Sequence, residues 1–83
     1  MTVGGRVPVT LRALLQRINR VLAKDTEVVK ATRPGPLRDE VGEYYRLDLH
    51  TNRIIEVNVD LEKLGRKLGA LRAFERLEKG KAQ

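Results

Sequence analysis

Residues 42–69, GEYYRLDLHTNRIIEVNVDLEKLGRKLG, hold two alternating segments, a turn, and a segment bounded like a helix. Residues 43–49 and 53–59 alternate polar and apolar side chains, which is typical of half-buried strands. Asp60 suits the N-cap of a helix and Gly69 suits a left-handed C-terminal cap. Gly65 in the helix interior is unfavourable unless a neighbouring element approaches closely there. The stretch therefore predicts a β-hairpin followed by a helix over 61–68.

Two registers of this hairpin keep the apolar side chains of both strands on one face. The first pairs Leu49 with Ile55, and it places Asp48 against Glu56. Two carboxylates directly opposite each other repel, so this register is disfavoured.

The second register pairs Leu49 with Arg53 and closes a three-residue turn over 50–52. It sets Arg46 opposite Glu56, and it puts Asn52 where such a turn needs a left-handed residue. We therefore expect this register. Its remaining pairs are Leu47 with Ile55 and Tyr45 with Val57.

An amphipathic helix is expected over 11–24, with Thr10 as its N-cap. Its apolar face is formed by Leu11, Leu14, Leu15, Ile18, Val21 and Leu22. Its opposite face carries Arg12, Gln16, Arg20 and Lys24, with Arg17 and Asn19 on the flank of that face. Residues 11–24 contain no acidic side chain. Like charges four residues apart destabilise a helix, so this pattern favours a polyanionic partner. The alternative is an ordinary solvated face.

The segments around these elements are less sharply defined. Residues 27–32 are rich in β-branched side chains and favour a third strand, although an extension of the first helix stays possible. Residues 33–41 contain Pro34, Gly35 and Pro36, which indicates a loop. Residues 1–9 and 80–83 are expected to be disordered ends of a single domain over 1–83.

Residues 70–79 are expected to form a short separate helix, because their apolar positions do not continue the stripe of Leu61. A helix-turn-helix is a weaker hypothesis, based on the spacing of Gly65 and Gly69. It fails at Glu75 and Glu78, where that motif needs apolar residues. Its DNA contacts would be Arg66, Lys67, Arg72 and Arg76.

The expected fold is therefore α+β, in the order α-β-β-β-α-α. A small antiparallel sheet of two or three strands would carry the N-terminal helix and one or two C-terminal helices on one face. That face would bear Tyr45, Leu47, Ile55 and Val57.

The composition of the chain limits the classes of protein to which it can belong. The 83 residues carry 17 Lys and Arg against 11 Asp and Glu, a net charge of +6 that favours nucleic acid as a partner. The chain has no Cys, and no apolar run reaches the ~18 residues of a membrane span. We expect a cytoplasmic protein without a membrane partner.

The side chains needed for common catalysis are missing. There is no Ser or Cys, and the only His, His50, falls in the predicted turn. One His cannot build a His-based metal site, and the acidic residues lack a cation-loop pattern. We expect no enzyme activity, no metal and no cofactor.

Four segments, INRVLAKD (18–25), GEYYRLD (42–48), TNRIIE (51–56) and VDLEKLGRKLGAL (59–71), carry a resemblance. In combination they resemble short proteins of unknown function found on bacterial plasmids and integrative elements. The similarity covers about residues 11–77. The resemblance implies a bacterial accessory protein with an α+β fold, and it assigns neither an activity nor site residues.

The function expected first is nucleic-acid binding or regulation. The phosphate contacts would come from Arg12, Arg17, Arg20, Lys24, Arg66 and Lys67. The alternative is a module that binds a host protein or a second copy of itself. It would use the outer hairpin face, where Tyr44 and Ile54 are apolar residues expected to meet solvent.

Overall fold

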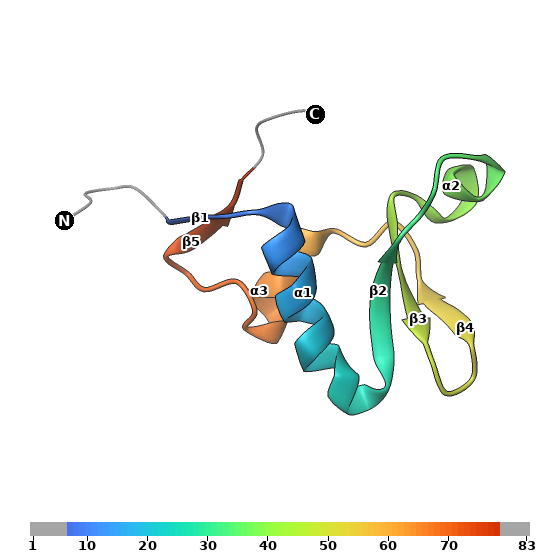
Figure 1. Cartoon of the computed structure of the whole chain (residues 1–83), viewed down its shortest axis with the longest axis horizontal. Coiled ribbons are helices and arrows are strands. Elements are labelled where there is room, and N and C mark those ends of the chain that lie inside the picture. The colour runs from blue at the N-terminus through green and yellow to red at the C-terminus, as the bar shows by residue number, and fades with distance from the viewer. Residues whose placement is uncertain (1–6, 79–83) are drawn as a thin grey trace.

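The structure is a computed structural model, and it describes residues 7–78. Figure 1 shows its helices and strands in chain order. They are β1 (Val7–Val9), α1 (Leu11–Leu22), the 3₁₀ turn η1 (Ala23–Asp25), β2 (Glu27–Ala31), α2 (Pro36–Val41), β3 (Tyr44–Asp48), β4 (Arg53–Glu56), α3 (Leu61–Leu68) and β5 (Glu75–Leu77). The α+β class and the small antiparallel sheet are confirmed, whereas the predicted element order is only partly matched.

Helix α1 begins where the sequence places it. The Thr10 Oγ1 accepts a hydrogen bond of 3.1 Å from the Ala13 backbone N–H, which satisfies one of the free donors of the first turn. The α-helix ends at Leu22, two residues before the predicted end, and continues as η1. Thr26 then adopts a left-handed φ of 59°, which turns the chain into β2.

Residues 27–31 form strand β2, which confirms the strand interpretation of this segment. The sheet has the order β2-β3-β4, and both pairs are antiparallel. Arg46 joins all three strands, since its guanidinium lies 3.2 Å from a Glu27 oxygen and 3.3 Å from a Glu56 oxygen. The predicted pairing of Arg46 with Glu56 is confirmed.

Between Arg46 and the turn, the predicted hairpin register is wrong by one residue, whereas the predicted pair of Tyr45 with Val57 stays a prediction. A β-bulge between Arg46 and Leu47 shifts the pairing, so Leu47 lies opposite Ile54 and Asp48 opposite Arg53. A bulge sets two residues against one, which alternation of side chains alone does not reveal. Asn52 has the expected left-handed φ of 60°, but the turn spans four residues because Leu49 is unpaired with β4.

The buried face of the sheet is the opposite of the predicted one. Val29 is 2% exposed and belongs to the core, and Tyr44 packs against it. Cross-strand partners share a face, so Leu47 lies with Ile54 on the far side. The helices therefore do not cover the face with Tyr45 and Leu47, and Ile55 and Val57 are exposed as well.

The core lies between α1, α3 and β2. Leu14 and Ile18 are completely buried, and Leu64 of α3 packs with them. Asp60 caps α3 by accepting hydrogen bonds from two backbone N–H groups, and Gly69 ends it with φ 79°, both as predicted. A Cβ at Gly65 would lie 2.9 Å from Leu14 Cδ1, so the close approach predicted at this glycine is confirmed.

Asn19 attaches the sheet to α1. Its side-chain amide accepts a hydrogen bond of 2.7 Å from the Val29 N–H and donates one of 3.1 Å to the Val29 carbonyl. The amide thus takes the place of a neighbouring strand at the free edge of β2, and it covers backbone groups that would otherwise be unpaired.

Two segments differ in type from the prediction. Residues 36–41 form helix α2 within the expected loop, because Pro36 occupies the first helical turn, where a missing N–H is harmless. Residues 75–77 form strand β5, parallel to β1, instead of a C-terminal helix. The helix-turn-helix hypothesis is therefore wrong, since no helix follows α3 in the described chain.

Of the ends expected to be disordered, residues 7–9 form β1, while residues 1–6 and 80–83 lie outside the described residues.

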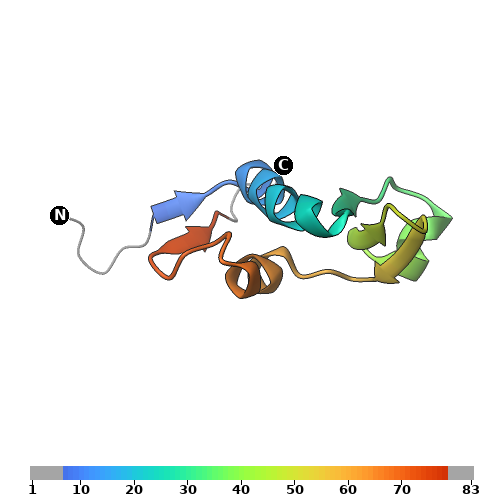
Figure 2. The same ribbon diagram turned by 90° about the horizontal axis from the view of Figure 1, so that it is seen from below.

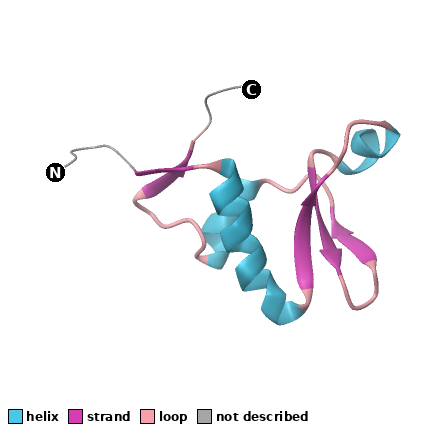
Figure 3. Ribbon diagram, viewed as in Figure 1, coloured by secondary structure: helices cyan, strands magenta, loops and turns pink. Residues whose placement is uncertain are grey.

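The elements are spread out along one direction. The principal extents are 46 × 30 × 15 Å, and Figure 2 shows the thin dimension. The Cα radius of gyration is 13.9 Å, against about 12 Å for a compact chain of this length. In Figure 3, α1, α3, β1 and β5 form one half, and β3, β4 and α2 form the other, with β2 between them. We call these the helical half and the hairpin half.

Candidate nucleic-acid interface

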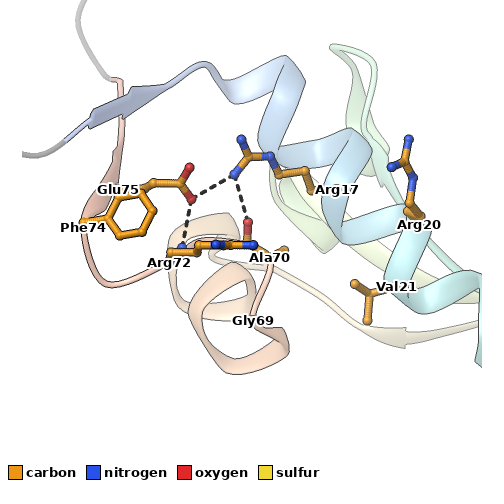
Figure 4. A pocket seen from close by; sticks show the side chains of 8 residues that line it. All are labelled: Arg17, Arg20, Val21, Gly69, Ala70, Arg72, Phe74 and Glu75. Atoms are coloured by element: carbon orange, nitrogen blue, oxygen red, sulfur yellow. Dashed lines mark hydrogen bonds and ion pairs between the residues drawn. The ribbon is translucent and has the colours of Figure 1, made fainter.

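A shallow depression of about 520 Å³ lies between α1 and the segment that follows α3. Figure 4 shows the side chains around it. Three of them are arginines from parts of the chain that are distant in sequence: Arg17 and Arg20 of α1, and Arg72 of the later segment. The other lining residues are Val21, Gly69, Ala70, Phe74 and Glu75. We call this site the arginine depression.

Glu75 is hydrogen-bonded to two of the arginines of the arginine depression. Its Oε1 accepts hydrogen bonds from Arg17 Nη1 at 2.9 Å and from the Arg72 backbone N–H at 3.0 Å. The hydrogen bond from the Arg72 backbone is the main cause that lowers the pKa of the Glu75 carboxyl below its usual value. Burial acts in the opposite direction, and the hydrogen bond and charge of Arg17 lower the pKa further. Glu75 is therefore a carboxylate at neutral pH.

Arg17 has a structural role as well as a place in the site. Its Nη1 also donates a hydrogen bond of 3.2 Å to the Ala70 carbonyl, just after the end of α3. The positive charge thus meets both the Glu75 carboxylate and a carbonyl near a helix C-terminus, where cations are favoured. Its side chain is still 43% exposed, so one side of the guanidinium faces solvent.

Arg20 and Arg72 carry the free positive charge of the depression. Both are exposed, and neither takes part in an ion pair within residues 7–78. Phe74, which is 55% exposed, lines the same depression. The depression thus combines two guanidinium groups that form no ion pair within residues 7–78 with an exposed aromatic ring, a combination suited to phosphate and base.

The structure separates the six residues predicted to contact nucleic acid. Arg17 and Arg20 meet in the arginine depression. Lys24 lies in η1, exposed and one turn beyond Arg20. Arg12 is exposed but lies about 140° around the α1 axis from Arg17, by the ~100° per residue of a helix.

The two predicted residues of α3 differ from each other. Arg66 is held in place: it pairs with Glu62 at 3.3 Å and donates hydrogen bonds to the carbonyls of Arg72 and Glu75. It stabilises the segment that carries Arg72 and Phe74. Lys67 is exposed and lies outside the lining of the depression.

Sequence reasoning found Arg72 only through the wrong helix-turn-helix hypothesis, and it missed Phe74 as a site residue. Phe74 falls in the segment that was predicted to be a short helix, and no role was predicted for it. No signal in the sequence marks it, since Leu71 and Leu77 lie three residues before and after Phe74, as in an ordinary apolar helix face.

The predicted partner-binding pair is also separated. Tyr44 is half-buried against the core, and burial, aided by the charge of Glu43 and opposed by Arg38, raises the pKa of its hydroxyl. It is thus a core residue and not an outer one. Ile54 is 42% exposed, as expected. Other exposed apolar side chains of the hairpin half are Leu37, Leu49, Ile55 and Val57.

Within residues 7–78 there is no group of three or more His, Asp or Glu side chains that could hold a metal ion. His50 is exposed in the β3–β4 turn. No helix of the described chain is long and apolar enough to cross a bilayer. The expectation that the chain is not an enzyme stays a prediction.

Comparison of the chain with known protein families, curated proteins and solved structures gives no match. The resemblance to proteins of plasmids and integrative elements therefore also stays a prediction.

Proposed function

We propose that this chain is a small, non-catalytic nucleic-acid-binding protein with an accessory or regulatory role, and that the arginine depression contacts phosphates. The observation that carries the proposal is the convergence of Arg17, Arg20 and Arg72 on one open surface. The only carboxylate among the lining residues, Glu75, is already engaged by Arg17 and by the Arg72 backbone. A phosphate would therefore meet net positive charge.

Phosphate contacts of this kind have a measurable signature. Each contact releases counterions, so log K falls by ~0.9 per decade of salt on duplex DNA and by ~0.7 on a single strand. Two or three arginine contacts predict slopes of roughly −2 to −3 on a duplex. A protein whose charge serves only solubility would show no such binding.

The test is a titration of fluorescently labelled DNA and RNA, starting at ~50 mM salt, with the wild type and two double variants. Arg20→Ala/Arg72→Ala removes the free charge of the depression. Lys30→Ala/Arg33→Ala removes the same charge from exposed positions at the far end of β2. We expect the first variant to bind at least tenfold more weakly with a salt slope reduced by about 2, and the second to keep its slope.

Absence of binding by the wild type would refute the proposal. Equal losses in the two variants would also refute the assignment to the arginine depression, because net charge alone would then explain the affinity.

The apolar surface of the hairpin half supports a second candidate, self-association. Ile54 and Ile55 of β4 are 42% and 45% exposed, and Leu37, Leu49 and Val57 are exposed in the same half. Strand β4 is also the open edge of the sheet, since the order is β2-β3-β4 and α1 covers β2 through Asn19. An open edge with apolar side chains is a surface on which another strand can add. A second copy of the chain would supply that strand.

Light scattering over a range of protein concentrations tests this candidate. We expect the wild type to be a dimer at high concentration and Ile54→Lys to be a monomer, because a lysine on an edge strand opposes pairing. Val7→Lys changes a similarly exposed apolar residue in the helical half and serves as the control. A monomeric wild type at every concentration would exclude self-association.

A further inference from the structure

Phe74 is exposed, although aromatic residues are scarce in this chain. The sequence contains one Phe, two Tyr and no Trp. Both tyrosines are half-buried, whereas Phe74 is 55% exposed. Full burial of a phenylalanine side chain stabilises a fold appreciably, so an outward position forgoes that stabilisation. The position of Phe74 therefore calls for a physical reason.

Hydrogen bonds on both sides of Phe74 fix the backbone at this position. Residues 72–75 form a tight turn in which the Glu75 N–H donates a hydrogen bond of 2.9 Å to the Arg72 carbonyl. The Glu75 carboxylate closes the same turn from the other side by accepting from the Arg72 N–H. The Phe74 carbonyl accepts a hydrogen bond of 2.8 Å from the Val7 N–H. These bonds fix the backbone from which the ring projects, and the residue is 55% exposed.

A ligand for this site has to satisfy both the ring and the charges. Phe74, Arg20 and Arg72 line one depression of about 520 Å³, within the ~300–1,000 Å³ range of small-ligand sites. A nucleotide has an aromatic base for the ring and a phosphate for the guanidinium groups. Stacking on a phenylalanine needs an open base face, which a base inside a duplex lacks.

The geometry points to single-stranded nucleic acid as the ligand, with one base stacked on Phe74 and the neighbouring phosphates held by Arg20 and Arg72. This inference rests on the proposed function, since it names the substrate class of the same site. Stacking tolerates every base, so binding shows little sequence preference. The turn is preorganised by its hydrogen bonds, so little ordering of the backbone is needed on binding.

The experiment compares a labelled oligothymidylate with a duplex of the same length, using the wild type, Phe74→Ala and Phe74→Trp. We expect the wild type to favour the single strand. Phe74→Ala should weaken single-strand binding about tenfold or more, leave duplex binding unchanged, and keep the salt slope. Leu37→Ala, which shortens an exposed apolar residue in the hairpin half, is the matched control and should change neither affinity.

Phe74→Trp provides an independent readout. The chain has no other tryptophan, so indole fluorescence reports on this position alone. We expect this variant to retain affinity and its emission to be quenched when the oligothymidylate binds. Unfolding curves recorded by circular dichroism verify that the variants are folded.

The outcomes separate this inference from the proposed function. Binding of both ligands with no effect of Phe74→Ala would overturn the single-strand inference and leave the phosphate site intact. A wild type that prefers the duplex would overturn it as well. No binding of either ligand would overturn the proposed function, and the inference with it.

Discussion

Isoleucine occurs in both halves of the molecule, and its exposure to solvent differs strongly between them. Ile18 of α1 is completely buried, whereas Ile54 and Ile55 of β4 are 42% and 45% exposed. The helical half holds most of the buried core, although Val7, Leu11 and Phe74 are exposed there. The hairpin half exposes more of its large apolar residues, namely Leu37, Leu49, Ile54, Ile55 and Val57. The comparison teaches that the two halves contribute unequally to stability: the helical half contains most of the core, and the hairpin half contains most of the exposed apolar side chains.

The largest effect is expected from truncating a core residue of the helical half. Leu14→Ala removes a completely buried side chain that faces Gly65 of α3, and it should lower the free energy of unfolding by about 2–5 kcal/mol. Ile54→Ala, in the hairpin half, should lower it by less than about 1 kcal/mol. Urea denaturation followed by circular dichroism measures both. Equal losses would show that the two halves contribute alike.

A smaller effect is expected at the contact between the two long helices. In Gly65→Ala, the new Cβ would lie 2.9 Å from Leu14 Cδ1 and 3.2 Å from Leu71 Cβ. This crowding should outweigh the better helix propensity of alanine, with a net loss of about 1–3 kcal/mol. The loss should shrink when Leu14→Ala is already present, because the cavity accepts the methyl group. A double-mutant cycle checks this, and additive losses would disprove the direct contact.

Asn19→Ala tests the attachment of one half to the other. It removes two hydrogen bonds to the buried Val29 backbone, and unpaired backbone groups should lower stability by about 1–2 kcal/mol. Gln16→Ala, at an exposed position of the same helix, is the control and should change little. Amide hydrogen exchange at Val29 should accelerate in Asn19→Ala alone. Unchanged protection would mean that α1 covers the edge of β2 without this side chain.

The smallest effect at neutral pH is expected at Glu75. The pKa of the Glu75 carboxyl is lower in the folded chain than its usual value of 4.5. The ionised carboxylate therefore stabilises the folded chain at pH values above 4.5. The contribution is lost as the pH falls through the lower, folded value. Glu75→Gln should therefore show a weaker loss of stability on acidification than the wild type, as measured by thermal unfolding between neutral and acidic pH. Parallel curves would show that Glu75 does not govern this pH dependence.

Local chemistry made much of the fold predictable. Thr10, Asp60 and Gly69 mark helix ends through side-chain caps or a left-handed backbone, and each acts within a few residues. The pairing of Arg46 with Glu56 followed from opposite charges at one position of the hairpin. In each case the decisive partner is close in sequence or fixed by the turn.

The wrong predictions concern features that depend on residues distant in sequence or on a local backbone irregularity. Strands β1 and β5 are three residues each and pair across nearly the whole described chain, so no local pattern marks them. The bulge at Arg46 and Leu47 breaks a register that alternation treats as uniform. The choice of sheet face depends on how α1 sits against Val29, which the hairpin residues do not encode.

The site was predictable only in part. The acid-free face of α1 identified Arg17 and Arg20, because charge patterning is visible along a helix. It could not show that Glu75 engages Arg17, or that Arg72 and Phe74 lie in the same depression. These contacts join residues more than fifty positions apart, and only the tertiary fold brings them together.

The parallel pair of β1 and β5 has a consequence for synthesis of the chain on the ribosome. Val7 is opposite Glu75, so the first described strand has no partner until the last one has been made. Glu75 also supplies the carboxylate that Arg17 of α1 requires. Folding during translation therefore cannot finish before β5 has left the exit tunnel, and a contact between residues so distant in sequence favours slow completion of the fold.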